Sequence, residues 1–377
     1  MKKILFFSPY FHPYISGITV YPLQILTYLA HKHTITVLTF PHTNDLKPEE
    51  VINNITIKRM PFLFRISKGF ISPQSLIFFL KEVRNHDVVL LNIPNFEGLF
   101  LAIIAKIYRK KIITIFHCEV YLGKNIVLRV INAFLNTSVY VQLFLSDTIV
   151  AYPDYINSLL VYKYISHKIH YSLPPIKKLS IDKKALTTFK KIKGNTIWIG
   201  FVGRIAREKG LEYLIDAARR LKIENRQIKL MFVGPYGDDV SGEKSYFFLI
   251  KKLLTDYGIA HEFLGNISDE VLGSFYKSID VLVLPSINKT EAFGMVQAEA
   301  MMLGTPIIAS DQAGVKLPVK LTHMGISVNP RDTQQFVNAL YKVIIQKDVY
   351  SNEKLIQKTH TIFSQKPVFN LYEELVV

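Results

Sequence analysis

The chain has 377 residues, of which 49% are hydrophobic and 20% are charged, so length and composition favour two folded domains and exclude a disordered chain. Its single cysteine, Cys118, excludes a disulfide framework within the chain and fits a reducing compartment. The apolar run after the first two lysines ends at Ser8-Pro9, which is too short for a signal peptide and predicts a buried first strand.

The net charge of +16 is unevenly distributed along the chain. Residues 1–180 hold 20 Lys or Arg against 9 Asp or Glu, whereas residues 181–377 hold 26 against 21. A basic excess in the first half favours nucleic acid, an anionic membrane surface or phosphorylated small molecules as partners. General solubility charge explains it equally well.

No uninterrupted apolar run of about 18 residues exists, and polar side chains break the best candidate, residues 130–150, so no membrane-spanning helix is predicted.

Short apolar runs of strand length alternate with longer helical patterns along the whole chain. The predicted strands are KILFFSP, TITVLTF, DVVLLNI, KIITIFH and DTIVAYP in the first half and IWIGFVG, IKLMFVG, HEFLG, DVLVLP and TPIIAS in the second. Continuous apolar runs are typical of parallel strands that are buried on both faces. The repeated pattern predicts an α/β chain with two doubly wound, Rossmann-like domains. The segment 173–195, rich in Pro and Lys, is the predicted linker.

A cationic loop follows the strand IWIGFVG. Gly203 allows a sharp turn there, and Arg204 and Lys209 lie between the strand and a helix whose apolar positions begin at Leu211. Ligands of open α/β sheets bind at the carboxyl ends of the strands, and helix N-termini favour phosphate. The two cations are therefore candidates to neutralise a diphosphate, although two ordinary surface cations fit these residues alone equally well.

A second loop and helix carry two carboxylates eight positions apart. The strand DVLVLP precedes Glu291, and the following helix is predicted to start near Gly294–Met295 and to stop at Gly304. Backbone N–H groups of Phe293 to Val296 would face an anion. Glu291 could then accept hydrogen bonds from sugar hydroxyls, and Glu299 from a ribose. For either acid alone, a solvated helix residue or a partner of the helix dipole is the simpler explanation.

Three segments resemble the donor-binding half of the family-4 retaining glycosyltransferases, which have the GT-B fold: FVGRIAREKG, FLGNISDEVLGSFYKSIDVLVLPS and EAFGMVQAEAMMLGTPIIAS. Glu291 and Glu299 match the E-x7-E pair of that family. In the first half, SPYFHPYISGITVYPLQILTYLAHKHTITVLT is similar to the family's first strand, glycine loop and helix, TIFH to its histidine-bearing strand, and FSQKPVFNLYEEL to its closing segment. The resemblance implies an acceptor-side domain, 1–180 joined by 362–377, facing a nucleotide-sugar domain, 181–361, across a cleft.

The resemblance also implies roles for the donor-site residues. Arg204 and Lys209, helped by the backbone at Gly17, would neutralise the donor diphosphate. Glu291 would bind hydroxyls of the sugar, with backbone contacts from residues 293–296. The donor is then expected to be a UDP or GDP sugar, transferred with retention to an acceptor hydroxyl in a hexosyltransferase-like reaction.

Glu299 would hold the ribose, and His117 would lie near the sugar and the reacting centre. Without the resemblance, a hydrogen-bonded core histidine is the better interpretation of His117, and Cys118 is better explained as filling a buried strand end than as a nucleophile. The chain departs from the family pattern at Ser16-Gly17, where the family usually has two glycines. The Ser16 side chain is expected to narrow the approach to the diphosphate. The chain departs again at Ala292, which adds only a methyl group.

The sequence contains no Asp-x-Asp pair that could hold a divalent metal on a diphosphate. No metal and no cofactor are therefore expected besides the nucleotide-sugar co-substrate. The cations Arg204 and Lys209, together with the helix N-terminus, would stabilise the leaving group instead.

Aromatic and basic residues are mixed within residues 58–84, and a second cationic cluster, AKIYRKK, occupies residues 105–111. The first mixture comprises Phe62, Phe64, Phe70, Phe78 and Phe79 with Arg59, Arg65, Lys68, Lys81 and Arg84. It suits an anionic membrane interface and predicts a cytoplasmic protein, peripheral on the inner face of the cell membrane, with a lipid-linked or envelope-glycan acceptor. Core aromatics with solvated lysines fit equally well.

Three alternatives to a glycosyltransferase can be considered for this sequence. No recognised nucleic-acid-binding module is present, so a nucleic-acid partner is not expected. A sugar-nucleotide epimerase of the GT-B fold and a non-catalytic protein that binds anionic surfaces stay as alternatives.

Overall fold

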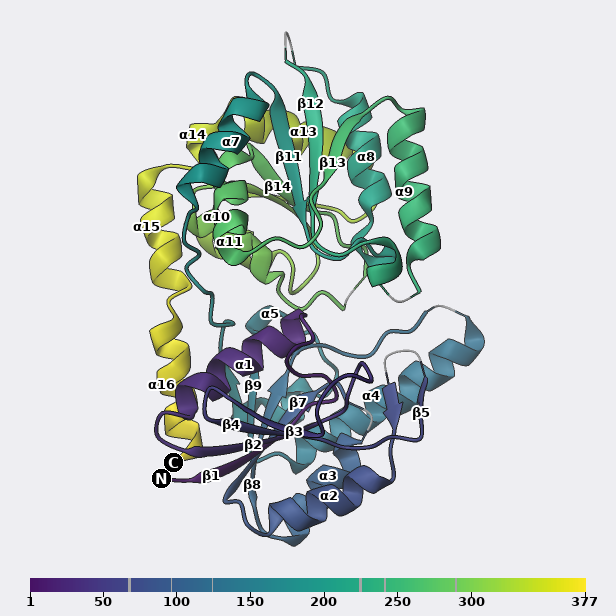
Figure 1. Cartoon of the computed structure of the whole chain (residues 1–377), viewed down its shortest axis with the longest axis vertical. Coiled ribbons are helices and arrows are strands. Elements are labelled where there is room, and N and C mark those ends of the chain that lie inside the picture. The colour runs from purple at the N-terminus through teal and green to yellow at the C-terminus, as the bar shows by residue number, and fades with distance from the viewer. Residues whose placement is uncertain (67–68, 96, 124, 224–225, 241, 289) are drawn as a thin grey trace. The chain divides into compact units, whose positions relative to one another are not determined.

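A computed structural model of the chain shows two compact units (Figure 1). It describes all residues except 67–68, 96, 124, 224–225, 241 and 289. Unit 1 comprises Met1–Pro175 and Gln365–Val377, and unit 2 comprises Ile176–Ser364. The sequence placed the corresponding boundaries at 180/181 and 361/362.

Unit 1 is built on a sheet with the strand order β10-β9-β8-β7-β1-β2-β4-β3, which is parallel except for the pair β3 and β4 at one edge. Its strands are β1 (Lys3–Phe7), β2 (Thr34–Thr39), β3 (Glu49–Ile52), β4 (Ile55–Arg59), β7 (Val88–Ile93), β8 (Lys111–Phe116), β9 (Thr148–Ala151) and β10 (Ile169–Tyr171), with a separate hairpin of β5 (Phe64–Ile66) and β6 (Gly69–Ile71). The central strands are buried along their length, as their continuous apolar runs predict.

The helices of unit 1 cover both faces of this sheet. They are α1 (Gly17–Leu29), α2 (Gln74–Val83), α3 (Gly98–Ile107), α4 (Ile126–Leu145), α5 (Pro153–Ile156), α6 (Tyr162–Ile165), the 3-10 turn η1 (Ser166–Lys168) and α16 (Gln365–Val376). The C-terminal helix α16 packs against α1, and the hydroxyls of Tyr21 and Tyr372 lie 2.7 Å apart between them. The last segment of the chain therefore completes unit 1.

Helix α4 is longer and more apolar than the sequence analysis expected. By length and composition its 20 residues could cross a membrane, and only 17% of its most apolar window is buried. The sequence analysis looked for an uninterrupted apolar run. The mean hydropathy of α4 is high despite its polar residues, because the apolar residues outweigh them. However, α4 connects β8 to β9, and these strands pair directly in parallel at Ile113 and Thr148. Both ends of the helix are thus tied to one sheet, which a spanning helix could not satisfy.

Unit 2 is built on a parallel sheet with the strand order β13-β12-β11-β14-β15-β16. Its strands are β11 (Ile197–Val202), β12 (Ile228–Val233), β13 (Ala260–Phe263), β14 (Val281–Leu284), β15 (Ile307–Ser310) and β16 (Gly325–Val328). Its helices and 3-10 turns are α7 (Lys183–Lys193), η2 (Arg207–Lys209), α8 (Leu211–Arg220), η3 (Gly237–Asp239), α9 (Lys244–Asp256), α10 (Asp269–Ser278), α11 (Met295–Met302), α12 (Leu317–Thr322), α13 (Thr333–Ile345), α14 (Lys347–Tyr350) and α15 (Glu353–Ile362).

The predicted linker, 173–195, is wrong in its second half. Asp182 caps α7 by accepting a hydrogen bond from the Lys184 N–H at 2.8 Å, and the helix packs against α10. Within this packing, the ring centroids of Phe189 and Phe275 lie 6.2 Å apart. The half-buried apolar residues of this lysine-rich helix, Ala185, Leu186 and Phe189, do not form a continuous apolar run, so the sequence resembles a linker.

The strand order reverses within each sheet. In unit 1, α1 leads from β1 to β2, whereas α3 leads from β7 to β8 in the opposite direction, so the switch point lies at the carboxyl ends of β1 and β7. In unit 2, α8 leads from β11 to β12 and α11 leads from β14 to β15. Ligands of open α/β sheets bind at such switch points, which directs attention to these two edges.

Candidate functional site

Two loops meet at the switch point of unit 2, one after β11 and one after β14. The Ile287 N–H donates a hydrogen bond to the Glu208 carbonyl over 2.9 Å. Gly210, with φ 63°, packs so closely that a Cβ there would lie 2.5 Å from Ile287 Cγ2 and 2.7 Å from the Pro285 carbonyl oxygen. Since only glycine satisfies both the backbone angle and this approach, Gly210 holds the two loops together.

The predicted turn at Gly203 is present directly after β11. Its φ is 146°, and a Cβ on Gly234, after the neighbouring strand, would lie 2.4 Å from the Gly203 carbonyl oxygen. The backbones of the two loops therefore touch at the sheet edge. This contact sets the direction in which the chain continues to Arg204.

Both cations predicted to bind phosphate are paired with carboxylates. Lys209 forms an ion pair with Glu291, and their side chains are only 13% and 19% exposed. The Arg204 guanidinium lies 3.0 Å from a Glu208 carboxylate oxygen. Because lysine carries three N–H donors and arginine five, each can keep its carboxylate and still donate to a phosphate.

Helix α11 begins at the position that the sequence predicts. Its N-cap, Gly294, has φ 74°, and a Cβ there would lie 2.5 Å from a methyl group of Leu284. The first-turn N–H groups of Met295 and Val296 have no acceptor within the helix, so the positive end of α11 lies at the carboxyl edge of β14. Phe293 is buried and anchors the preceding loop.

The two motif acids have separate partners. Glu291 lies in the loop before α11 and is held by Lys209, with the Ser286 hydroxyl 3.5 Å away. Glu299, in the second turn of α11, accepts a hydrogen bond from the Tyr276 hydroxyl at 3.0 Å. Burial raises the pKa of Glu299 to about 7, although the Tyr276 hydrogen bond opposes this rise. Glu299 is therefore not the fully solvated helix residue of the simpler explanation.

A polar network centred on Asn92 occupies the switch point of unit 1. Its side-chain amide donates to the Ser8 hydroxyl and to the Ile18 carbonyl, both at 2.9 Å. The Ile18 carbonyl needs this donor because Pro22, one turn later in α1, has no N–H. The Asn92 carbonyl oxygen lies 2.8 Å from Nε2 of His117. The network ties the ends of β1, β7 and β8 to α1.

This network determines the protonation state of His117. Asn92 uses its amide hydrogens on Ser8 and Ile18, so its oxygen must accept the hydrogen carried by Nε2 of His117. Burial lowers the pKa of His117 to about 3, and the imidazole is neutral. It is the hydrogen-bonded core histidine favoured by the residues alone. Any contact of this ring with a sugar is confined to Nδ1 acting as an acceptor.

The structure also locates the glycine loop. Gly17 is the first residue of α1, and the preceding Ser16 N–H donates to the Thr19 hydroxyl over 3.0 Å. Gly17 thus lies at the switch point of unit 1, whereas the cations and the motif acids belong to unit 2. Each unit carries its own part of the predicted site.

Sequence reasoning missed Asn92 and a buried acid, Glu97. Glu97 precedes α3, and its two carboxylate oxygens have no hydrogen-bond partner among the described residues. Burial raises its pKa to about 7. A single acid in a loop gives no sequence signal. Asn92 could have been found, because it interrupts the apolar run of a central strand.

The aromatic and basic mixture within residues 58–84 is divided between core and surface, because Phe64, Arg65, Phe78, Lys81 and Arg84 are exposed. Phe70 and Phe79 are buried in the core, and Arg59 is buried in an ion pair with Glu50. Phe64 remains 52% exposed, and Lys68 lies outside the described residues. Phe70 and Phe79 are therefore core aromatics, and the membrane-interface interpretation stays a prediction for the exposed residues of this stretch.

The chain is similar in sequence to known glycosyltransferases. Residues 182–361 match the family described as Glycosyl transferases group 1. A D-inositol 3-phosphate glycosyltransferase of Corynebacterium urealyticum is 33% identical over 155 residues, 40% of this chain and 35% of that protein. The match therefore spans only about a third of that relative.

Two solved structures share the fold over both units. Sucrose-phosphate synthase of Thermosynechococcus elongatus has a TM-score of 0.78 at 18% identity and covers 100% of this chain and 98% of its own. The Anabaena protein HepE in complex with UDP-glucose has a TM-score of 0.77 at 17% identity and covers 99% of both chains. The predicted α/β, two-domain GT-B fold is thereby confirmed, and residues 182–361 of unit 2 are a Glycosyl transferases group 1 domain.

Proposed function

We propose that the chain is a retaining glycosyltransferase that moves a sugar from a nucleoside diphosphate donor to an acceptor hydroxyl. The observation that carries the proposal is the pairing of two loops at the switch point of unit 2, where Lys209 binds Glu291 shortly before the N-terminus of α11. Cations and a helix N-terminus suit a diphosphate, and a carboxylate suits sugar hydroxyls. The Glycosyl transferases group 1 domain includes all these residues and supports the same assignment.

The donor diphosphate is assigned to Arg204 and Lys209, with N–H groups from residues 293–296 and from the glycine loop at Gly17. Lys209 has a double role in this proposal, because it neutralises phosphate and orients Glu291. The UDP-glucose complex of the structurally similar Anabaena protein supports a UDP sugar as the first donor to test, and GDP sugars are the second.

The sugar is assigned to Glu291 and the ribose to Glu299. A carboxylate accepts hydrogen bonds only, so each acid would select a hydroxyl-bearing group. Glu299 accepts best when ionised, and its pKa of about 7 makes nucleotide binding sensitive to pH. His117 is neutral and would accept a sugar hydroxyl at Nδ1 in place of acting as an acid or base.

The acceptor is assigned to unit 1. Its basic excess supports a lipid-linked or envelope-glycan acceptor and attachment to the inner face of the cell membrane from the cytoplasm. The relative named for D-inositol 3-phosphate offers a second candidate, a soluble phosphorylated polyol, which the same cations would suit. Metal-independent transfer is proposed because fixed cations can stabilise the departing diphosphate.

A thermal-shift panel of UDP and GDP sugars, followed by product analysis, tests the proposal. At least one nucleotide sugar should raise the melting temperature, and the chain should then release free nucleotide from it in excess chelator. An epimerase would instead return the donor with an altered sugar; the glycosyltransferase names of the relatives do not favour this alternative. Failure of every nucleotide sugar to stabilise the chain would contradict the proposal.

A further inference from the structure

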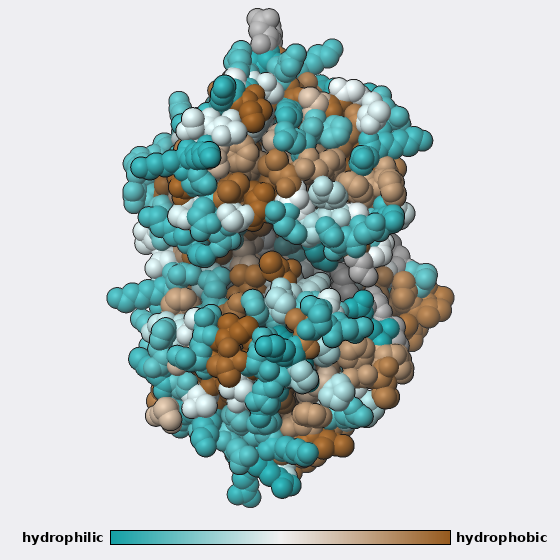
Figure 2. Space-filling model, in the orientation of Figure 1, coloured by the Kyte–Doolittle hydropathy of each residue, from teal (hydrophilic) through white to brown (hydrophobic). Residues whose placement is uncertain are grey.

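One face of α4 is apolar and exposed. Side chains spaced by three or four residues form it: Val127, Val130, Ile131, Phe134, Val141 and Phe144. Val130 and Phe134 are 64% and 69% exposed. Figure 2 shows this apolar surface at the right-hand edge of the molecule, where Figure 1 draws the beginning of α4. At about 1.5 Å per residue the helix is roughly 30 Å long, so the face is extensive.

The asparagines and the glutamine of α4 lie on its other side, whereas Thr137, exposed between Phe134 and Val141, donates its hydroxyl to the Ala133 carbonyl at 2.8 Å. The Asn136 side chain accepts from the Val120 N–H at 2.8 Å and donates to the Val120 carbonyl at 3.0 Å. Asn132 accepts from the Leu122 N–H at 2.9 Å, and Gln142 is buried. The asparagines therefore bind the loop that follows β8, and the exposed face is apolar except for Thr137.

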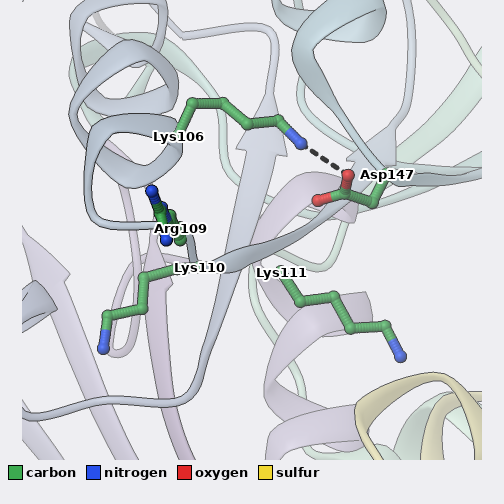
Figure 3. A pocket seen from close by; sticks show the side chains of 5 residues that line it. All are labelled: Lys106, Arg109, Lys110, Lys111 and Asp147. Atoms are coloured by element: carbon green, nitrogen blue, oxygen red, sulfur yellow. Dashed lines mark hydrogen bonds and ion pairs between the residues drawn. The ribbon is translucent and has the colours of Figure 1, made fainter.

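Helix α3 packs beside α4 and extends the apolar surface with Phe100, Ile103 and Ile107, all exposed. We call these residues and the exposed residues of α4 the α3–α4 face. Cations adjoin it at the end of α3, in a shallow depression of about 420 Å³ lined by Lys106, Arg109, Lys110, Lys111 and Asp147 (Figure 3). The acid of this group, Asp147, is paired with Lys106.

The charged residues around the α3–α4 face are mostly positive. Residues 98–168, which contain both helices, carry eight Lys or Arg against three Asp or Glu. Lys168 donates to the Phe144 carbonyl at 2.8 Å and so places a cation at the C-terminus of α4. An apolar helix face bordered by lysine and arginine is the pattern of helices that lie in a membrane interface. A second copy of the same chain would bring equally basic surroundings to the contact.

We propose that the α3–α4 face docks the chain on an anionic phospholipid bilayer, with α4 lying along the surface. The apolar side chains would enter the boundary between headgroups and acyl chains, and the cluster at residues 106–111 would meet anionic headgroups. We propose this surface in preference to residues 58–84, where Phe70 and Phe79 are buried in the core. Membrane docking itself does not depend on the proposed function. Only its biological role, which is to bring unit 1 to an acceptor in the membrane, rests on that proposal.

The docking surface is joined to the acceptor edge of unit 1. The loop held by Asn132 and Asn136 directly follows His117, and the Glu119 N–H donates to the Tyr155 hydroxyl at 3.0 Å. A bilayer contact along α4 therefore fixes the position of the loop after β8 relative to the membrane. An acceptor carried in the same bilayer would be presented to that loop.

Vesicle co-sedimentation of the full chain tests the proposal. The probes are phosphatidylcholine vesicles with and without about one third phosphatidylglycerol, at low and high salt. Wild type should bind the anionic vesicles at low salt. The double variant Val130→Glu with Phe134→Glu should weaken this binding at least about tenfold. The double variant Arg109→Asn with Lys111→Gln should weaken it by a similar factor. The matched control is Tyr341→Glu/Ile345→Glu, because these residues of α13 are also four apart and are 52% and 53% exposed.

Binding of UDP and GDP to every variant, with light scattering for size, accompanies the vesicle assay. Loss of vesicle binding with nucleotide binding intact supports the docking surface, and vesicle binding without any nucleotide binding supports it while contradicting the proposed function. The docking surface is overturned if wild type ignores anionic vesicles, if the control variant loses as much binding, or if the Val130/Phe134 variant binds normally. If the Val130/Phe134 variant binds vesicles normally but is a monomer where wild type is a dimer, the α3–α4 face is a self-association surface.

Discussion

The switch points of the two units use polar residues in opposite ways. In unit 2 the polar groups are charged and form ion pairs, Lys209 with Glu291 and Arg204 with Glu208. In unit 1 the network around Asn92 is neutral and is satisfied internally. Charges that can exchange partners suit a site that binds and releases an anion, whereas a closed neutral network suits a rigid support. The comparison teaches that the same topology can carry a binding edge in one unit and a positioning edge in the other.

The largest expected effect sharpens the role of the charged edge. Glu291→Gln should lower turnover by about a hundredfold or more, because an amide replaces the carboxylate assigned to the sugar. It should not weaken diphosphate binding, since Lys209 loses a competing carboxylate. Steady-state kinetics and UDP titration of this variant measure the two effects, with Glu353→Gln on α15 as the control. A parallel loss of turnover and diphosphate affinity would break the division between sugar and phosphate.

The next effect concerns the neutral edge. Asn92→Leu should reduce the free energy of unfolding by about 1–3 kcal/mol, because it leaves the buried Ile18 carbonyl and Nε2 of His117 without their hydrogen-bond partner. Nucleotide binding at unit 2 should be unchanged. Urea unfolding together with UDP titration tests this. Stable folding with lost nucleotide binding would place Asn92 at the donor and contradict the comparison.

The smallest effect is a pH dependence carried by Glu299. Its pKa is about 7 in the folded chain, above the ordinary value of 4.5, so the folded state holds the proton more tightly. Stability should therefore fall as pH rises from about 4.5 to 7. Affinity for a nucleotide sugar, whose diphosphate ester does not titrate here, should rise by up to about fivefold between pH 6 and 7 as the carboxylate ionises. Glu299→Gln should flatten both profiles; an unchanged pH dependence in this variant would exclude Glu299 as its source.

Much of the fold could be predicted from the sequence because the central strands are continuous apolar runs. The start of α11 at Met295 could also be predicted, since Gly294 marks its N-cap. The exposed face of α4 could not, because a linear window counts Asn132 as an interruption although helical geometry turns it inward. The burial of Glu97 depends on neighbours distant in the chain, and no local pattern encodes it.

The central claim is that the charged edge of unit 2 binds a nucleoside diphosphate. Calorimetric titration of the full chain with UDP and GDP, comparing wild type with Arg204→Ala and Lys209→Ala, tests it most directly. Removing one charge-assisted contact should weaken binding by about 1.5–3 kcal/mol, roughly tenfold or more, in each variant. Lys222→Ala, which removes a lysine beyond the end of α8, should bind as wild type does. Wild-type affinity in both Arg204→Ala and Lys209→Ala would contradict the account.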